Sequence, residues 1–330
     1  MNEFDLIARY FTRPAQRAVL GVGDDCALLQ PTTGMQLAVS SDMLVEGRHF
    51  FPDVDPATLG HKALAVNLSD LAACGATPLA FTLALALPEI DEAWLQGFSS
   101  GLWALADAHG CELIGGDTTQ GPLNICITVF GEVPAGQALR RSGAKAGDDI
   151  YVSGTLGDAR MALEAKRGKI ILPPGLLAQA DARMEQPTPR VALGQALRGL
   201  ATAAIDLSDG LAGDLGHILK ASSVGATIST ASAMTLIADS ARKMIVKGYF
   251  DAENSFENLL DYVFSGGDDY ELAFTAPLSA RQAITDAAKH SGTIVTRIGR
   301  IDPKPGFRLI AKDGSQCERT FLSFDHFAAG

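Results

Sequence analysis

The chain has 330 residues, of which 47% are hydrophobic and 20% are charged, a composition typical of globular proteins. Lys and Arg total 27 against 38 Asp and Glu, and the formal net charge is -11. No basic run is present, which argues against a nucleic-acid-binding protein that meets phosphates with a positive stripe. A length of about 100–200 residues per domain predicts two domains.

The cysteines and the apolar segments indicate a soluble protein of the cytoplasm. The number of cysteines is odd and no two are spaced as C-x-x-C, so we expect reduced thiols and neither a disulfide framework nor a zinc site. The first 20 residues have no apolar core of a secretory signal. The longest apolar stretch, residues 78–88, is far shorter than the roughly 20 residues of a spanning helix.

The first half of the chain alternates predicted strands and helices. Residues 37–41 form an apolar run that predicts a strand, and Asp55-Pro56 is typical of a helix start. This helix is expected to end at about residue 73, before Gly75, and a second helix to cover residues 91–109. Further strands are predicted at residues 111–114, ending in Gly115-Gly116-Asp117, and at residues 123–133.

The second half repeats this alternation after a polar, glycine-bearing segment at residues 142–149. We therefore divide the chain into an N-terminal domain, 1–147, and a C-terminal domain, 148–330. Helices are expected from about Asp158 and at residues 189–200, 211–221 and 279–290, and strands at 150–153, 203–205, 270–275 and 293–301. Alternation of this kind predicts two α/β domains.

Short acidic clusters are the most informative feature. Four of the five are expected at strand ends or turns, where Asp and Ser commonly bond to nearby backbone, so each alone is more simply structural. They are Gly23-Asp24-Asp25, Ser40-Ser41-Asp42, Asn67-Leu68-Ser69-Asp70, Gly115-Gly116-Asp117-Thr118-Thr119 and Asp206-Leu207-Ser208-Asp209-Gly210.

Taken together, the clusters indicate a cation site. Asn67 and Asp70 share one face of an otherwise apolar helix, and Asp206 ends a strand that is expected to be buried. Carboxylates that converge on one cleft repel each other unless cations offset their charge. Oxygen-only ligands suit Mg²⁺, which is usually shared with substrate phosphates.

The chain lacks the common nucleotide-binding signatures. It contains no G-x-x-x-x-G-K-[ST], G-x-G-x-x-G, H-R-D or D-F-G motif, so any ATP is bound without a P-loop or a protein-kinase fold. Its six histidines are scattered, and no Ser-His-Asp set is evident.

The clusters and several further motifs, in this order, resemble those of the thiamine-monophosphate kinase family, from about Phe4 to Phe327. The motifs are Gly21-Val-Gly-Asp-Asp-Cys-Ala-Leu28, Ser40-Ser-Asp-Met-Leu-Val-Glu-Gly-Arg-His49, Lys62-Ala-Leu-Ala-Val-Asn-Leu-Ser-Asp-Leu-Ala72, Ile114-Gly-Gly-Asp-Thr-Thr119, Arg141-Ser-Gly-Ala-Lys-Ala-Gly147, Ile205-Asp-Leu-Ser-Asp-Gly210, Ser265-Gly-Gly-Asp-Asp-Tyr-Glu-Leu272 and Phe324-Asp-His-Phe327.

The resemblance implies the fold of the aminoimidazole-ribonucleotide synthetase superfamily. This fold has two α/β (α+β) domains with mixed sheets, and the N-terminal domain forms a barrel across a homodimer interface. The implied reaction transfers phosphate from ATP to thiamine monophosphate and gives thiamine diphosphate, with several Mg²⁺ ions.

The resemblance also implies a role for individual residues. The implied catalytic residues are Asp42, Asp70, Asp117 and Arg141. The implied magnesium ligands are Asp25, Ser40, Ser41, Asp42, Asp70, Asp117, Asp206 and Asp209. Gly116, Asp117, Arg141 and Ser208 match positions that bind ATP. His49, Asp268 and Phe324 match positions that contact the thiamine substrate. Three of these positions depart from the usual pattern: Ser41 replaces Thr, Asp268 replaces Glu, and Phe324 replaces Tyr or Trp.

Two alternatives stay open at this point. One is another ATP-dependent enzyme of the same superfamily. Cys26 inside an Ala-Leu-Leu run is unlike the reactive cysteine expected of selenophosphate synthetase, and the chain ends in Gly330, without the terminal cysteine expected of the hydrogenase-maturation dehydratase. The other alternative is a non-catalytic sensor of nucleotides or thiamine phosphates, for which so many carboxylates near anions would be unnecessary.

Overall fold

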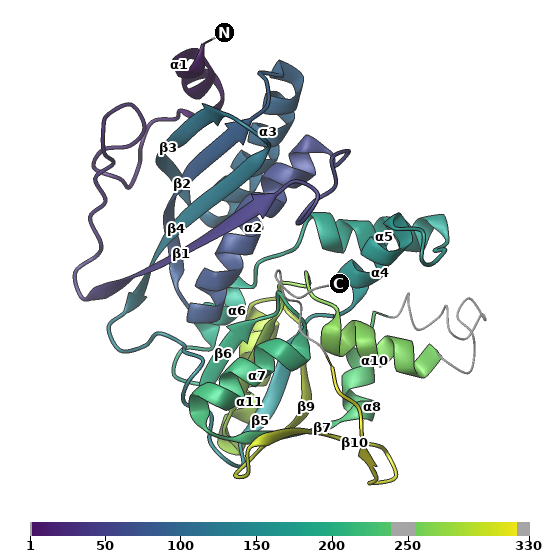
Figure 1. Ribbon diagram of the computed structural model, residues 1–330. Coiled ribbons are helices and arrows are strands. Elements are labelled where there is room, and N and C mark those ends of the chain that lie inside the picture. Colours follow the sequence, from purple (N-terminus) through teal and green to yellow (C-terminus); the bar gives the residue numbers. More distant parts are fainter. Residues whose placement is uncertain (1, 239–254, 322–330) are drawn as a thin grey trace. The chain divides into compact units, whose positions relative to one another are not determined.

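The computed structural model describes residues 2–238 and 255–321. It separates into two compact units (Figure 1). The first runs from the start of the chain to Leu71 and includes Ala76–Ala138, and the second contains Ala72–Gly75 and the chain from Leu139 onward. The boundary between residues 147 and 148 stays a prediction, because units defined by contacts need not coincide with independently folding domains.

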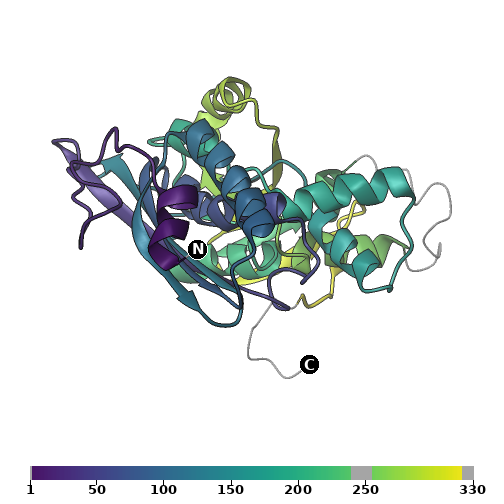
Figure 2. The ribbon, with the colours of Figure 1, turned by 90° about the horizontal axis from the view of Figure 1, so that it is seen from above.

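The first unit contains a four-stranded mixed sheet in the order β1-β4-β2-β3. Neighbouring strands are antiparallel except for the parallel pair β2 and β3. Helices α2 and α3 lie on the same side of this sheet (Figure 2). A short α1 and a π-helical turn η1 precede the sheet. The bounds are α1 Glu3–Leu6, η1 Ile7–Phe11, β1 Met35–Val45, α2 Pro56–Cys74, β2 Thr77–Leu87, α3 Glu92–His109, β3 Glu112–Gln120 and β4 Asn124–Pro134.

Helices α2 and α3 begin and end where the sequence predicts, for local reasons. The Asp55 carboxylate accepts hydrogen bonds from the backbone N–H groups of Ala57 and Thr58, and Asp91 caps α3 in the same way. Gly75 (φ 70°) follows α2 and Gly110 (φ 57°) ends α3, both in the left-handed conformation that glycine adopts at little cost.

Glycines allow α2 and α3 to pack at unusually short distance. A Cβ at Gly60 would lie 2.0 Å from the carbonyl oxygen of Phe98, and one at Gly101 would lie 1.8 Å from that of Ala57. Each contact is far inside van der Waals separation, so a side chain at either position would push the helices apart.

Gly60→Ala is therefore expected to lower the free energy of unfolding by about 1–3 kcal/mol, the usual cost of overpacking. The matched control is Gly216→Ala in α7 (Leu211–Ser222), where a Cβ meets no atom within 4 Å. That change should stabilise its helix by about 0.5–1 kcal/mol. Urea unfolding of both variants measures the difference, and an equal effect of the two would contradict close helix packing.

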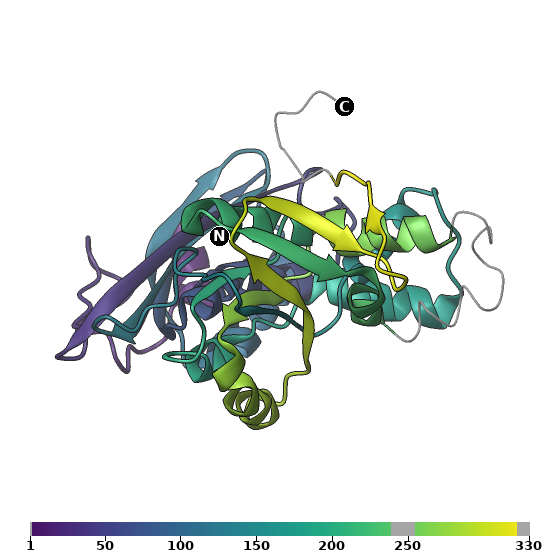
Figure 3. The ribbon, with the colours of Figure 1, turned by 90° about the horizontal axis from the view of Figure 1, so that it is seen from below.

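The second unit contains a seven-stranded mixed sheet in the order β11-β10-β7-β9-β5-β8-β6, which Figure 3 shows from below. Every residue of β5, β6 and β8 is buried, so these strands form the core. The strands are β5 Asp149–Ser153, β6 Ala203–Asp206, β7 Gly225–Ser229, β8 Leu272–Ala276, β9 Val295–Asp302, β10 Gly306–Ile310 and β11 Gln316–Cys317. The helices are α4 Asp158–Lys166, α5 Pro174–Glu185, α6 Val191–Ala196, α7 Leu211–Ser222, α8 Thr230–Ala233, η2 Met234–Leu236, α10 Ser255–Ser265, η3 Leu278–Ala280 and α11 Arg281–His290.

Mixed sheets with α-helices in both units confirm the predicted fold class. Two expectations about the acidic clusters were wrong. Residues 40–42 lie inside β1, and residues 115–119 lie inside β3, which continues to Gln120 because it pairs with β2 along its whole length. Several elements have no counterpart among the predicted ones, and α6 is shorter than the predicted helix at 189–200. The elements without a counterpart are α1, η1, β2, α5, β7, α8, η2, α10, β10 and β11.

Candidate active site

In the first unit, β1 and α2 bring four polar residues together: Ser40, Asp42, Asn67 and Asp70. Ser40 donates a short hydrogen bond from its Oγ to Oδ2 of Asp70. The backbone N–H of Asp42 donates to Oδ1 of Asn67 (3.1 Å), whose own Nδ2 donates to the carbonyl of Ala63 (3.0 Å). Asn67 is 1% exposed, whereas Ser40, Asp42 and Asp70 are half-buried. The predicted common face of Asn67 and Asp70 is confirmed, since both residues contact the same strand.

Alternation along β1 separates Ser41 from its two neighbours. Successive side chains of a strand point to opposite faces, so Ser40 and Asp42 share the α2 side and Ser41 points away from it. The Ser41 hydroxyl lies 2.9 Å from that of Thr128 and 3.6 Å from Sγ of Cys126. Ser41 therefore lies on the other face of the sheet from the Ser40–Asp70 pair.

Gly116 and Asp117 lie on β3, at the opposite edge of the sheet from β1. Asp42 is in register with Ile127, Leu83 and Gly116 across the four strands. Three strand spacings of about 4.8 Å put the Asp42 and Asp117 backbones roughly 14 Å apart. Asp117 follows Gly116 by one residue, so its exposed side chain is on the other face from that of Asp42. One copy of this unit therefore does not bring the two carboxylates together.

Gly116 is the point where β3 comes closest to β2. Its φ is 146°, and a Cβ there would lie 1.8 Å from the carbonyl oxygen of Leu83. Only glycine fits this position, whatever its predicted contact with ATP.

Asp25 and His49 lie outside the regular elements. Asp25 is exposed, and its backbone N–H donates to Oδ1 of Asp24 (2.8 Å). His49 follows β1, and its Nδ1 accepts a hydrogen bond from the backbone N–H of Val45 (2.9 Å). An accepting Nδ1 is unprotonated, so this geometry describes the neutral ring with its proton on Nε2.

In the second unit, two turns that carry predicted site residues are hydrogen-bonded to each other. The loop that follows β6 and the segment 266–271 that leads into β8 are paired. Asp268 N donates to Ser208 O (2.8 Å), Tyr270 N to Leu207 O (2.8 Å), and Leu207 N to Glu271 O (2.8 Å). The structure thus brings together three predicted site residues, Asp206, Ser208 and Asp268, from positions far apart in the sequence.

The backbone of this segment is strained. Asp268 (φ 60°) and Tyr270 (φ 49°) both adopt the left-handed conformation, which is rare for non-glycine residues and is an outlier for a bulky one. Each such residue costs on the order of 1–3 kcal/mol, and such strain clusters at functional sites. The Tyr270 hydroxyl donates to Oδ1 of Asp268 (3.1 Å). This bond orients the Asp268 carboxylate, which is predicted to contact the substrate.

Asp214, near the start of α7, organises the predicted metal and ATP residues of this unit. Its Oδ2 accepts the backbone N–H of Asp209 (3.1 Å). Burial raises the pKa of Asp214 to about 7, and the nearby Asp209 carboxylate also raises it, whereas backbone hydrogen bonds from Asp209 and Ser208 and the charge of Arg141 oppose the rise. The charge of Arg141 therefore acts on Asp214, which is bonded to the loop that carries Ser208 and Asp209.

The raised pKa of Asp214 predicts a pH-dependent stability of the metal-free protein. Because the folded state holds this proton more tightly than the unfolded chain, the stabilisation is complete below about pH 4 and is lost as pH rises towards 7. Asp214→Asn mimics the protonated form, so its stability relative to wild type should increase by a few kcal/mol over that range, at about 1.4 kcal/mol per pKa unit. Urea unfolding at several pH values measures this difference, and a constant difference would contradict the prediction.

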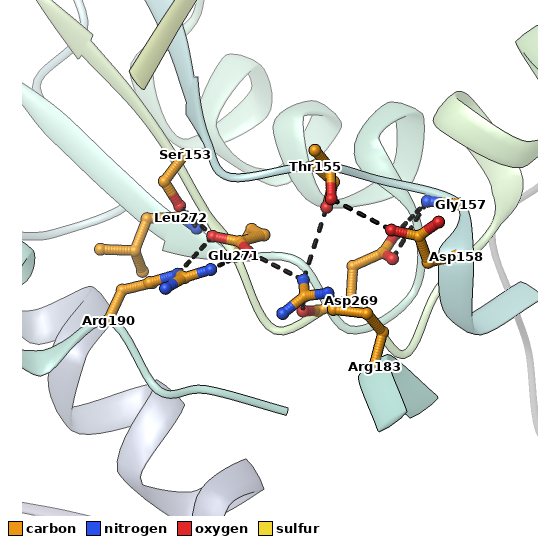
Figure 4. A network of polar contacts seen from close by, with 9 residues as sticks. All are labelled: Ser153, Thr155, Gly157, Asp158, Arg183, Arg190, Asp269, Glu271 and Leu272. Carbon is orange, nitrogen blue, oxygen red and sulfur yellow. Dashed lines mark hydrogen bonds and ion pairs between the residues drawn. The ribbon is translucent and has the colours of Figure 1, made fainter. Parts of the chain in front are cut away.

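A buried polar network lies behind the segment 266–271 (Figure 4). The Glu271 carboxylate is 0% exposed and accepts hydrogen bonds from Ser153 Oγ (2.6 Å), Arg183 Nη2 (2.8 Å) and Arg190 Nε (2.6 Å). Asp269 is also buried, and its carboxylate accepts the backbone N–H of Gly157 (3.0 Å). Complete burial raises the pKa of Asp269 well above its ordinary value, which favours the neutral acid.

The chemistry of the predicted ligands fits magnesium. All are carboxylates or hydroxyls, and Mg²⁺ is commonly held by one or two carboxylates together with waters and substrate phosphates. Within residues 2–238 and 255–321, no group of three or more His, Cys, Asp or Glu side chains is placed to hold a metal ion. The pairs Ser40–Asp70 and Asp209–Asp214 supply oxygen donors of the right kind.

Several residues of the site were missed by the sequence reasoning. Asp269 and Glu271 belong to the motif at residues 265–272 but were assigned no role, and Asp214 follows Asp209 by five residues in a largely apolar helix. Arg183 and Arg190 carry no such signal, because only the fold brings α5 and the start of α6 to this segment. The predicted substrate residue Phe324 lies outside the described residues.

Family models match most of the chain. The model described as AIR synthase related protein, N-terminal domain, matches residues 23–133, and the corresponding C-terminal domain model matches residues 145–312. A thiamine-monophosphate kinase of Escherichia coli is 47% identical over 99% of this chain and 98% of its own length. The chain belongs to the thiamine-monophosphate kinase family of AIR synthase related proteins. It is accordingly an enzyme of the kinase class.

Solved structures of this family share the fold. The thiamine-monophosphate kinase from Stenotrophomonas maltophilia has a TM-score of 0.82 and 44% identity, with 95% of this chain and 96% of that chain covered. A structure of AaThiL complexed with AMPPCP and TMP has a TM-score of 0.75 and 28% identity, with 90% and 89% covered. Along the described part of this chain, no helix has the length and apolarity needed to cross a membrane.

Proposed function

We propose that this chain transfers the γ-phosphate of ATP to thiamine monophosphate and produces thiamine diphosphate, the last step in making that cofactor. The observation that carries the proposal is 47% identity with a thiamine-monophosphate kinase along essentially the whole chain. The AaThiL structure complexed with AMPPCP and TMP supports the same pair of substrates for this fold.

The acceptor determines what the residues must do. A phosphate monoester has a second pKa of about 6, so it is mostly dianionic at neutral pH and is already a nucleophile. The reaction then needs no general base, and the task is to position two highly charged phosphates for direct in-line transfer. When bound, Mg²⁺ supplies the positive charge that offsets the phosphate oxygens during transfer.

We assign the roles as follows. Asp42, Asp70, Asp117 and Arg141 are the residues expected to be essential for transfer. The oxygen donors for several Mg²⁺ ions are Asp25, Ser40, Ser41, Asp42, Asp70, Asp117, Asp206 and Asp209. Gly116, Asp117, Arg141 and Ser208 bind ATP, and the Arg141 guanidinium can form a charged clamp on its phosphates. His49 and Asp268 contact thiamine monophosphate, as does Phe324, whose ring face suits the cationic thiazolium.

We further propose that the enzyme is a cytoplasmic homodimer with the N-terminal sheets at the interface. Strand β1 supports this, because alternate apolar residues on its outward face are exposed: Met35, Leu37, Val39 and Met43. The opposite placement of Asp42 and Asp117 in one sheet also supports a second copy, which could supply the missing carboxylate to each site.

The test is a magnesium-dependent ATP assay with thiamine monophosphate as acceptor, in which thiamine diphosphate is followed by chromatography. Product from the monophosphate, and none from free thiamine, is the expected result. No product from folded protein that binds ATP would overturn the choice of acceptor and leave the family fold intact.

A further inference from the structure

Arg183 has contacts that neutralisation of Glu271 does not require. Arg190 alone binds the Glu271 carboxylate through both Nε and Nη2, which balances its charge with two hydrogen bonds. Arg183 brings a second positive charge to the same carboxylate, although its side chain is only 21% exposed. Its Nε is buried, and no atom of the described residues accepts a hydrogen bond from it. A second, incompletely paired arginine is costly to bury, so another contact must explain it.

That contact is with the strained backbone of the segment 266–271. Arg183 Nη2 donates to the carbonyl oxygen of Asp269 (3.2 Å), and it reaches the carbonyl of Thr155 at 3.5 Å (Figure 4). The Asp269 carbonyl belongs to the peptide that joins Asp269 to Tyr270. This peptide directly precedes Tyr270, which is in the left-handed conformation, and Asp268, in the same conformation, lies one peptide earlier. A guanidinium bonded to it restricts the rotation that would release the strain.

The same peptide controls the orientation of the Asp268 carboxylate, which is predicted to contact the substrate. Tyr270 donates from its hydroxyl to Asp268 Oδ1 (3.1 Å), and the backbone of each residue is bonded to the loop after β6. Rotation of the Asp269–Tyr270 peptide would move the Tyr270 ring and with it the orientation of Asp268. Arg183 thus acts on Asp268 through the backbone of the segment 266–271, and it does not need to contact the substrate.

We propose that Arg183 is a positioning residue that holds Asp268 in the orientation that binds thiamine monophosphate; this rests on the proposed function. Arg190 and Glu271 hold Arg183 in place and neutralise the network. The effect should be larger on the acceptor than on ATP, because Arg183 bonds directly to the segment of Asp268 and reaches the predicted ATP residue Ser208 only through the Asp268 N–H.

The test compares Arg183→Met with a matched control, Arg308→Met. Arg308 is also partly buried, at 31% exposure, and it likewise binds one carboxylate, that of Asp302, and two carbonyls, those of Lys304 and Pro305. In Arg183→Met the KM for thiamine monophosphate should rise about tenfold, with the KM for ATP within about twofold of wild type. Arg308→Met should change neither KM. Arg183→Lys keeps a cation beside Glu271 without the planar fork, so it should fold and show the same KM pattern.

A double-mutant cycle identifies the route of the effect. If Arg183 acts through Asp268, Arg183→Met should change the KM for thiamine monophosphate less than about twofold in an Asp268→Asn background. A full effect in that background, or equal changes in both KM values, would overturn the proposal. So would an Asp268→Asn variant with wild-type KM, since Arg183 would then have nothing to position.

Hydrogen exchange keeps this proposal separate from the proposed function. Arg183→Met should speed amide exchange in the peptide 266–272 by at least about tenfold, and Arg308→Met should not. This readout needs no turnover. If the wild-type enzyme fails to phosphorylate thiamine monophosphate, the proposed function falls, while unchanged exchange in Arg183→Met would by itself overturn the positioning role.

Discussion

Asp42→Asn is expected to reduce turnover by about a thousandfold or more while the protein stays folded. The substitution removes one negative charge from the predicted magnesium site. It leaves the backbone contact intact, because Asn67 Oδ1 accepts a hydrogen bond from the backbone N–H of residue 42. Asp70→Asn should act in the same way, since an amide oxygen can still accept the Ser40 hydrogen bond but carries no charge.

Steady-state kinetics over a range of Mg²⁺ concentrations, together with thermal unfolding, measures both parts of this expectation. Asp53→Asn is the matched control, because Asp53 is an exposed carboxylate of the same unit. It should retain wild-type activity. Near-normal turnover in both Asp42→Asn and Asp70→Asn would rule out the metal-binding role of β1 and α2.

Glu271→Gln is expected to destabilise the second unit by about 3–5 kcal/mol, the usual cost when one partner of a buried ion pair is lost. The substitution preserves shape but leaves Arg183 and Arg190, 21% and 18% exposed, without their shared negative charge. Asp261→Asn is the control: its pair with Arg319 is 46% exposed at the carboxylate, so the loss should be under about 1 kcal/mol.

Urea unfolding followed by circular dichroism measures the two variants side by side. A loss in Glu271→Gln no larger than in Asp261→Asn would show that the network contributes little to stability. The role proposed for Arg183 in substrate binding would then be decided by the kinetic cycle and by hydrogen exchange.

Local signals made much of the helical structure predictable. Helices α2 and α3 have an aspartate cap at one end and a glycine at the other, and both features lie within a few residues of the boundary. Strands β4 and β5 are dense in β-branched residues, and their predicted positions differ from the observed ones by one residue. Family resemblance, carried by ordered motifs, supplied the kinase class.

Features that depend on strand pairing or on other contacts between distant residues were not predictable from local signals. Residues 115–117 contain two glycines and an aspartate, which is typical of a turn, but β2 pairs along this stretch and keeps it extended. The apolar run 78–88 shows neither the alternation of a half-buried strand nor the periodicity of an amphipathic helix. The sequence therefore could not distinguish the strand β2 from a buried helix. Arg183 is 86 residues from Asp269 and 88 residues from Glu271 in the sequence. Nothing in the sequence of α5 itself predicts these two contacts.

The sequence suggested a set of candidate residues but not their arrangement. The clusters around Ser40, Asp70 and Asp209 were identified from their composition. Which of them share a face depends on the order β1-β4-β2-β3, which the sequence does not contain. The separation of Asp42 from Asp117 follows only from that order.

Alternation along β1 makes this strand intolerant of insertion or deletion. Adding or removing one residue between Met35 and Ser40 would slide the downstream strand by one register position against β4. Ser41 would then take the side facing α2, and Ser40 and Asp42 would turn to the face now lined by Met43 and Val39. In a library of single-codon indels, the eleven residues of β1 should therefore behave as a segment of fixed length.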